Sequence, residues 1–378
     1  KKTGNFRAQF LIESLIDLDK NLRAVGSGLI VVKGNPAVEI GKLAQQFQVD
    51  KVFAKKEIAY EELVTKTKVE IELKKINCLL ETFAKSTLYH SDDLPFSVND
   101  TPNVFTDFRK IVERASTIRD LFPQPTQIKS PSIDTINLPS LHEVGLVDCV
   151  FDCRAAIEFK GGETEGYKRV YHYLSETHAI ATYKETRNGM IGENYSSKFS
   201  AWLALGCLSP KIIYHAIKKY EAQYCSKEST YWLIFELLWR DFFVWMMEKY
   251  PIQFFKMNGI KKTEIIFSKH DINLFERWKN GTTESDFINA NMLELKLTGF
   301  MSNRGRQNVA SYLCHNLKLD WRYGAAYFEE QLIDYDACSN WGNWAYIAGV
   351  GNDPRENRIF NIEKQVLLIR FFIIRNLS

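Results

Sequence analysis

Residues 298–313 read TGFMSNRGRQNVASYL, a run that brings several polar side chains close together among apolar ones. Side chains three and four residues apart are neighbours on an α-helix. A helix that begins near Ser302 therefore carries one mostly polar face, formed by Asn303, Arg306, Gln307 and Ala310. This face needs polar partners, and the rest of the chain has to supply them.

The composition is that of a globular, nearly neutral protein. The 378 residues suffice for two domains with cores of their own, and 45% apolar and 25% charged residues fit this class. The formal charge of +3 gives no argument for nucleic acid, so any such affinity has to come from a local patch. The 25 Phe, 17 Tyr and 8 Trp gather after residue 165 and indicate an aromatic interior there.

Cysteine and histidine usage indicates neither disulfides nor metal. The seven cysteines are scattered and show no metal-ligand spacing, so we expect free thiols in a reducing compartment. The seven histidines form no metal pattern. No signal peptide or membrane span is visible. The chain starts KKTGNFR and ends VLLIRFFIIRNLS, and we interpret both ends as incomplete, which leaves the cellular compartment undetermined.

Helix and strand signals alternate over residues 1–90. Residues 6–25 have helical apolar spacing, and LIVVK (29–33) has the character of a buried strand. A second helix is predicted from Pro36 to Phe47, followed by a strand over residues 49–55. This alternation predicts an α/β domain with a parallel sheet.

The remainder of the chain has a different character. Residues 91–165 are rich in Pro, Ser and Asp, which predicts a linker that carries a few helical turns, such as residues 106–116. Strand signals nearly vanish beyond Gly166, and long aromatic helices follow. We therefore predict a helical domain over residues 166–378, with an atypical C-terminal tail.

The run STYWLIFELLWRDFFVWMMEKY (229–250) is apolar almost all round, which predicts a buried helix. Glu236 and Arg240 are four residues apart on it, in the order that favours pairing. Buried charges are costly unless they pair or meet a polar ligand. On this helix alone, we favour a structural ion pair over a ligand site.

Two further runs carry candidate site residues. Asp334, Asp336 and Asn340 follow one another in a glycine-containing aromatic stretch, where Asp334 is a natural partner for Arg306. Local turns and caps are the alternative for these side chains. The run from Ser196 to Lys198 precedes an apolar helix, so it either caps that helix, which is commoner, or holds phosphate. Together the runs predict a cavity for a large planar cofactor with a diphosphate tail.

Several long runs resemble the cryptochrome and DNA photolyase family, in particular its DASH branch. The matching runs are TGNFRAQFLIESL, STLYHSDDLPF, STYWLIFELLWRDFF, TGFMSNRGRQNVASYL, LDWRYGAAYFEEQLIDYDACSNWGNW and GVGNDPRENRIFN. They extend from residue 3 to about residue 365. The resemblance implies an N-terminal Rossmann-like domain, here without its first strand–helix–strand unit, joined by a long linker to an all-helical domain that binds FAD in a bent form.

The resemblance also implies roles for individual residues. The FAD phosphates and neighbouring groups would be held by Tyr183, Ser196, Ser197, Lys198, Phe199 and Ser200. The cavity would be lined by Leu233, Glu236 and Arg240. The adenine, sugar and flavin ring would be surrounded by Asn303, Arg306, Phe328, Asp334, Asp336 and Asn340. In this arrangement Arg306 and Asp334 would tune the charge of the flavin, and Asn340 would lie near its N5 atom.

The implied reaction is blue-light-driven electron transfer from reduced FAD to a cyclobutane pyrimidine dimer. The implied partner is single-stranded DNA, with RNA or duplex DNA bound more weakly, and the protein is expected to be a monomer. The pocket for the lesion would be formed by Glu236, Trp239, Gln307 and Tyr346, and flanking phosphates would meet Arg187 and Arg304. Core packing is the alternative for Trp239 and Tyr346.

Two other functions stay open on the sequence. One is a blue-light photoreceptor that binds FAD and nucleic acid without repair. The other is a nucleic-acid-binding remnant without flavin, suggested by departures from the family pattern. The family's TGYP motif, expected to border the cavity, is replaced by a segment that contains Glu284, Ser285 and Asp286.

The resemblance implies two further functional elements. Trp344 and Trp321 match the inner and middle members of the family's electron-transfer chain. The position of the outer member holds Ser268, with Phe267 beside it, and we interpret Trp278 as structural. A methenyltetrahydrofolate antenna would contact Glu61 or Glu62, for which solvated surface is the alternative.

Overall fold

The structure is a computed structural model, which describes residues 2–83, 86–224, 226–261, 271–355 and 359–362. Its N-terminal part has helices and strands in alternation. Their bounds are α1 (Asn5–Ala24), α2 (Pro36–Gln46), β1 (Lys51–Lys55), α3 (Tyr60–Lys74) and β2 (Leu79–Phe83). The helices predicted over residues 6–25 and 36–47 and the strand predicted over 49–55 are confirmed.

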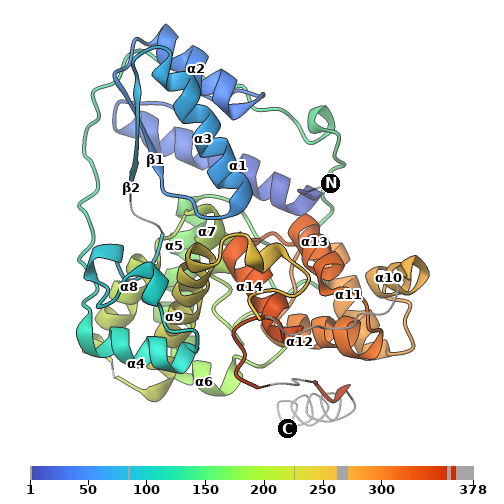
Figure 1. Ribbon diagram of the computed structural model, residues 1–378. Helices are drawn as coiled ribbons and strands as arrows, with labels where there is room; N and C mark the ends of the chain where they lie inside the picture. Colours follow the sequence, from blue (N-terminus) through green and yellow to red (C-terminus); the bar gives the residue numbers. More distant parts are fainter. Residues whose placement is uncertain (1, 84–85, 225, 262–270, 356–358, 363–378) are drawn as a thin grey trace.

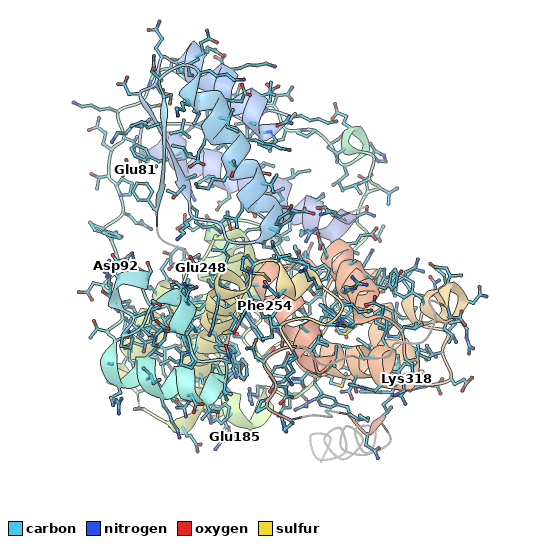
Figure 2. All side chains as sticks on the ribbon, in the orientation of Figure 1. Glu81, Asp92, Glu185, Glu248, Phe254 and Lys318 are labelled. Carbon is cyan, nitrogen blue, oxygen red and sulfur yellow. The ribbon has the colours of Figure 1, made fainter. Side chains whose placement is uncertain are left out.

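The two strands form a small parallel sheet, in which Lys51 lies opposite Leu79 and Lys55 opposite Phe83. Helices α2 and α3 pack on each other beside it (Figure 1). Their shared core is a small cluster of Ala37, Ala44, Val69, Leu73 and Cys78. Glu81 of β2 projects into solvent (Figure 2). The parallel sheet expected from the alternation is therefore present, with two strands among the described residues.

The strand predicted over residues 29–33 is wrong. This segment has no regular secondary structure, and Ile30 and Val32 are 39% and 47% exposed. The backbone amide of Leu29 donates to the carboxylate of Asp19 at 2.9 Å. A strand needs a neighbour with which to exchange backbone hydrogen bonds. In the part of the chain that is described, the sheet consists of β1 and β2, so apolar character alone did not produce a strand here.

The linker crosses the surface and returns to α1 before the helical part begins. It contains α4 (Phe105–Ala115), which confirms the helix predicted over 106–116. The amides of Gly161 and Gly162 donate to Glu13 and Ser14 of α1 at 2.7 and 3.0 Å. A Cβ at position 161 would collide with the backbone of α1, so this close approach requires glycine.

The helical part is built around one buried helix. Its elements are α5 (Glu163–Tyr171), α6 (Tyr183–Thr186), α7 (Ser200–Leu205), α8 (Pro210–Gln223), α9 (Glu228–Lys249), α10 (Ile272–Lys279), α11 (Asp286–Thr298), α12 (Asn303–Ser311), α13 (Trp321–Gln331) and α14 (Ala337–Ile347). Helix α9 packs against α6, α8 and α14 (Figure 1). Phe254 is 1% exposed and belongs to the same large core (Figure 2). The buried helix predicted over 229–250 is thus confirmed.

Helix α9 also anchors the chain that leaves the sheet. Asp241 is fully buried, and its two carboxylate oxygens accept the backbone amides of Leu88 and Tyr89 at 2.9 and 3.0 Å. Burial raises the pKa of Asp241 to about 7, against the opposing effect of these two hydrogen bonds. The neighbouring Arg240 donates to the carbonyl oxygen of Ser86. These two consecutive side chains therefore fix the segment between the sheet and the linker to the helical core.

Three other features of the described residues bear on function. None of their helices is long and apolar enough to cross a membrane. The cysteines among them are free thiols, three of which are buried. They also contain no cluster of three or more His, Cys, Asp or Glu side chains that could hold a metal ion.

Candidate functional site

A cavity of about 700 Å³ lies in the helical part, lined mainly by α9, α12, α14 and the segment that leads into α7. It adjoins a recess of about 90 Å³, with which it shares lining residues such as Asn303, Arg306 and Asp334. Small-molecule and cofactor sites in proteins span roughly 300–1,000 Å³. The cavity is thus large enough for an extended cofactor.

The polar face predicted for residues 303–310 is confirmed. The hydroxyl of Ser302 caps α12 by accepting the amide of Gly305 at 3.0 Å, which places the helix start where the sequence indicated. The members of the predicted face then all line the recess: Asn303, Arg306, Gln307 and Ala310.

Arg306 and Asp334 form the polar pair at the centre of the site. Arg306 donates to Asp334 at 2.9 Å and to the carbonyl oxygen of Met301 at 2.8 Å. The Asp334 side chain is 2% exposed, and its Oδ1 atom is buried with no hydrogen-bond partner among the described residues. An orphaned carboxylate oxygen is costly, so this atom is a candidate to accept a hydrogen bond from a ligand.

Asp336 and Asn340 have structural contacts as well as a place in the lining. Asp336 caps α14 by accepting the amide of Ser339 at 2.8 Å, which confirms the capping alternative for this residue. The amide nitrogen of Asn340 donates to the carbonyl oxygen of Ala325 at 3.0 Å. Both side chains nevertheless border the recess, together with Phe328 and Trp344.

The segment before α7 lines the cavity, but its serines do not cap the helix. The N-terminal cap of α7 is Phe199, without a side-chain hydrogen bond, so the capping expected of Ser196 and Ser197 is wrong. The reason is that the chain turns at Lys198, with φ of +56°, which separates the serines from the helix start. These residues therefore border the cavity without an intrahelical role.

Lys198 is the buried cation of this segment. Its Nζ donates to the carbonyl oxygens of Gly192 and Glu193 at 2.7 and 2.8 Å. An ammonium has three donors, so one of them is left for a ligand within the described surroundings. Burial lowers the pKa of Lys198 to about 8, and the nearby charge of Arg169 acts in the same direction. An anionic group in the cavity would restore the pKa.

The ion pair predicted between Glu236 and Arg240 is wrong. Glu236 pairs with Arg187, the C-terminal cap of α6, and the guanidinium of Arg187 lies 4.5 Å from the ring centroid of Trp232. Burial raises the pKa of Glu236, while the charge of Arg187 acts to lower it. The side chain of Arg240 instead reaches Ser86. Glu236 and Arg240 thus bind residues from other segments of the chain and not each other.

Trp239 and Tyr346 form an aromatic wall of the cavity. The ring of Trp239 stacks on Phe105 with centroids 3.7 Å apart and meets Tyr346 edge to face at 5.8 Å. Trp239 therefore packs against the core, as the packing alternative expects, and also lines the cavity, while its contact with a lesion stays a prediction.

Arg304 lies in the same cavity and is partly desolvated. It donates to the side-chain oxygens of Gln307 and Asn188 at 3.0 and 2.7 Å. Burial lowers the pKa of Arg304, and the like charge of Arg187 adds to this effect. Two arginines close to each other in a cavity wall favour binding of a phosphate.

The structure brings together almost all of the residues predicted for the site. Those with predicted cofactor or substrate contacts line the cavity or the recess, as does Trp344. Trp321 does not: it is fully buried elsewhere and donates to the carbonyl oxygen of Met257 at 3.0 Å. Ser268 and Phe267 lie outside the described residues.

The segment that replaces the TGYP motif does not border the cavity, contrary to expectation. The Ser285 side chain caps α11, and none of residues 284–286 is part of the lining. Of the two candidates for an antenna contact, Glu61 is exposed and paired with Lys2. Glu62 is exposed as well, and partial desolvation raises the pKa of its carboxyl group.

Sequence reasoning missed part of the lining. Ser339, Asn343 and Ile347 of α14 also border the recess. They lie four residues apart on one face of α14, so helical periodicity in the sequence could have predicted that they share this face. Asn188 and Arg355 come from segments without periodic signal, and only the fold brings them to the cavity.

The lining fits FAD on chemical grounds. The volume accommodates an extended ligand. The orphaned oxygen of Asp334 can accept a hydrogen bond from it, and the cations Lys198 and Arg306 suit a ligand with anionic groups such as phosphates. Aromatic side chains such as Phe328 and Trp344 border the recess and suit a planar ring.

Comparisons with known proteins agree with this fit. Residues 1–128 match the family model described as DNA photolyase, and residues 232–367 match that of the FAD binding domain of DNA photolyase. Cryptochrome DASH of Danio rerio is 50% identical over 374 residues, which cover 97% of this chain and 71% of that protein. Cryptochrome DASH of Gloeobacter violaceus is 48% identical over 366 residues, covering 97% and 73%.

A solved structure of a cryptochrome from Synechocystis sp. PCC6803 has the same fold, with a TM-score of 0.92 at 45% identity. The similarity covers 97% of this chain and 76% of that one. At this identity and coverage, the chain belongs to the cryptochrome and DNA photolyase family and, within it, to cryptochrome DASH, and it carries the FAD-binding domain of that family.

Proposed function

We propose that this chain binds FAD in the cavity and repairs cyclobutane pyrimidine dimers in single-stranded DNA under blue light. The observation that carries the proposal is that Glu236, Trp239 and Gln307 line the same cavity as the Arg306–Asp334 pair. A base turned into this cavity would lie beside the cofactor. Bound FAD would supply the light absorption and the electron that the reaction needs.

The cofactor would be held by side chains from opposite walls. Asp334 would accept a hydrogen bond on its orphaned oxygen, while Arg306 keeps its bond to the other oxygen. Lys198 would direct its remaining donor to the diphosphate, supported by the neighbouring serines of residues 196–200. Asn340 would border the flavin ring, where its neutral side chain adds no charge.

The lesion would be received by the aromatic and polar wall. Trp239 and Tyr346 exclude water and offer apolar surface to the pyrimidines. Glu236 and Gln307 are the polar groups beside them that can form hydrogen bonds with the pyrimidine edge. Since Glu236 is partly buried and its pKa is raised, its carboxyl group can hold a proton more readily than a surface glutamate.

Binding requires an exchange of partners in the cavity. Arg187 is paired with Glu236, and Arg304 with Gln307, before any ligand enters. DNA phosphates would draw the two arginines away and free both polar groups for the base. Turning a base out of a duplex costs a few kcal/mol, and least in a single strand, which supports single-stranded DNA as substrate.

A second candidate is a blue-light photoreceptor that binds FAD and nucleic acid without repair. The same internal pairing favours it, because a pocket whose polar groups satisfy one another has a lower affinity for a base. A folate antenna near Glu61 or Glu62 stays a prediction in either case.

The test is repair of an irradiated oligothymidine by the purified protein loaded with FAD. The oligonucleotide is exposed to blue light with the protein, and restored thymine is measured by chromatography, with dark and protein-free controls. We expect restoration in the single strand and less in a duplex. Bound, photoreducible FAD without restored thymine would reject repair and leave the photoreceptor. A folded protein that takes up no FAD would reject both.

A further inference from the structure

A chain of aromatic rings leads from the recess to the surface through Trp278. Trp344 borders the recess and meets Trp278 edge to face, with centroids 6.2 Å apart. Trp278 stacks on Phe275 at 5.9 Å, and Phe275 lies 5.8 Å from Tyr323. Tyr323 is 40% exposed, whereas Trp278 is fully buried. Each step is a direct ring contact, so the path from cavity to solvent is continuous.

The ring contacts of Trp321 point elsewhere. Its ring meets Trp341 at 5.7 Å, and Trp341 in turn meets Phe255 at 4.9 Å. Trp344 contacts Trp278 and Phe328 among the described rings. Trp278 is fully buried in the core, as its structural interpretation from the sequence expects, and it is also in direct contact with Trp344.

We propose that Trp278 and Tyr323 form an electron-donating branch that restores Trp344 after Trp344 has lost an electron to the bound cofactor. The proposal rests on FAD binding, which the family shows, and on the light-driven electron transfer of the proposed function. It does not depend on repair of DNA. It adds Trp278 and Tyr323 as electron donors to Trp344. The terminal donor is then Tyr323, which is 40% exposed.

Electrons pass along the branch one at a time. With the cofactor bound and excited by light, Trp344 would give it one electron, and Trp278 would give one electron to the oxidised Trp344 ring. Tyr323 then gives one electron to Trp278 past the Phe275 ring, which is too hard to oxidise to act as a carrier. The phenol proton of Tyr323 leaves to water. In each of two rounds, one external thiol group returns one electron and one proton to Tyr323, and the two thiol groups that have reacted join as one disulfide.

Tyr327 is the competing end point, because its ring also meets Trp278, at 5.9 Å. It is 8% exposed, and burial raises its pKa well above the ordinary value for tyrosine. Oxidation of tyrosine needs somewhere for the proton to go. Tyr323 has water for this purpose and Tyr327 has little, so the exposed residue is the better terminal donor.

The first test uses Tyr323→Phe, with Tyr327→Phe as the matched control. The FAD-loaded protein is illuminated without DNA and frozen, and the tyrosyl radical is measured by electron paramagnetic resonance. We expect the radical in the parent protein and in Tyr327→Phe, and its loss in Tyr323→Phe. Because Tyr323 is exposed, its replacement leaves the fold intact, which FAD content and apoprotein melting temperature verify. A radical unchanged in Tyr323→Phe would overturn the proposal.

A second test separates the branch from the route through Trp321. We expect Trp321→Phe to retain a tyrosyl radical and photoreduction with thiol, and the double variant Trp321→Phe/Trp278→Phe to lose both. If Trp321→Phe alone abolishes the radical while FAD stays bound, the branch carries no electrons and the proposal fails. Repair with chemically reduced FAD is measured in parallel, because it reports the proposed function without any photoreduction. Loss of repair there would reject the function and leave the branch intact.

Discussion

Arg187, at the end of α6, forms its ion pair with Glu236 of α9, although Arg240 lies one helical turn from that glutamate. Arg187 also lies over Trp232 and beside Arg304. Glu236 and Gln307 of the cavity wall are therefore each paired with an arginine. On the proposed function, entry of DNA would break these pairs and replace them with contacts to phosphates and to the base.

The two arginines provide a test of this exchange. We expect Arg187→Met and Arg304→Met each to weaken binding of single-stranded DNA and to reduce its salt dependence by roughly 0.7 in the slope of log K against log salt, because each removes one phosphate contact. Fluorescence anisotropy at several salt concentrations measures this slope. Arg277→Met, on the exposed side of α10 and outside the cavity lining, is the matched control. An unchanged slope in both cavity variants would argue against phosphate contacts.

The Arg306–Asp334 pair predicts a link between FAD content and stability. We expect Asp334→Asn to lower the free energy of unfolding by about 2–3 kcal/mol and to reduce bound FAD, because it leaves a partly buried guanidinium without its anion. Visible absorption of the purified protein and chemical denaturation measure the two effects. Asp271→Ala, which removes the cap of α10 far from the cavity, should cost about 1 kcal/mol and keep FAD. Full FAD content in Asp334→Asn would contradict the assignment.

Trp239 tests the distinction between packing and lesion binding. Base stacking on an aromatic side chain contributes about 1–3 kcal/mol, so Trp239→Phe is expected to raise KM for the damaged oligonucleotide several-fold. Phe105 stacks on the same ring but does not line the cavity. Phe105→Leu should therefore lower the melting temperature and leave KM unchanged. Equal effects of both variants on KM would mean that Trp239 acts through core packing alone.

Asp241 predicts how stability depends on pH. Its pKa is about 7 in the folded chain, against about 3.9 in an unfolded one, so the folded state binds the proton more tightly. The free energy of unfolding is therefore expected to fall as the pH rises from about 4 to about 7, by up to about 4 kcal/mol, and to level off above that range. Denaturation of the apoprotein at a series of pH values measures the slope.

The control for this slope is Asp241→Asn, which cannot ionise. It should flatten the dependence while lowering stability overall, because an amide nitrogen would face the amide of Leu88 or Tyr89. Glu294 is a second contributor, since burial raises its pKa to about 7 as well, and Glu294→Gln should remove its share. A slope that survives both substitutions would place its origin elsewhere in the chain.

Local patterns sufficed for much of this protein. The cap at Ser302 and the helical period together predicted which side chains of α12 line the recess. The apolar run of α9 predicted a buried helix. The carboxylates in the glycine-containing aromatic stretch made Asp334 the expected partner of Arg306, and the two residues do pair. These features depend on residues that are close together in the sequence and on long sequence motifs, so the sequence alone suffices to predict them.

The partners of buried charges and the pairing of strands needed the three-dimensional arrangement. Glu236 pairs with a residue 49 positions away because α6 packs against α9, and Arg240 reaches the segment after β2 for a similar reason. Residues 29–33 have the composition of a strand but no strand beside them in the described chain. Periodicity reports which face of a segment is apolar, whereas hydrogen bonds and ion pairs depend on which distant groups the packing of the chain brings within reach.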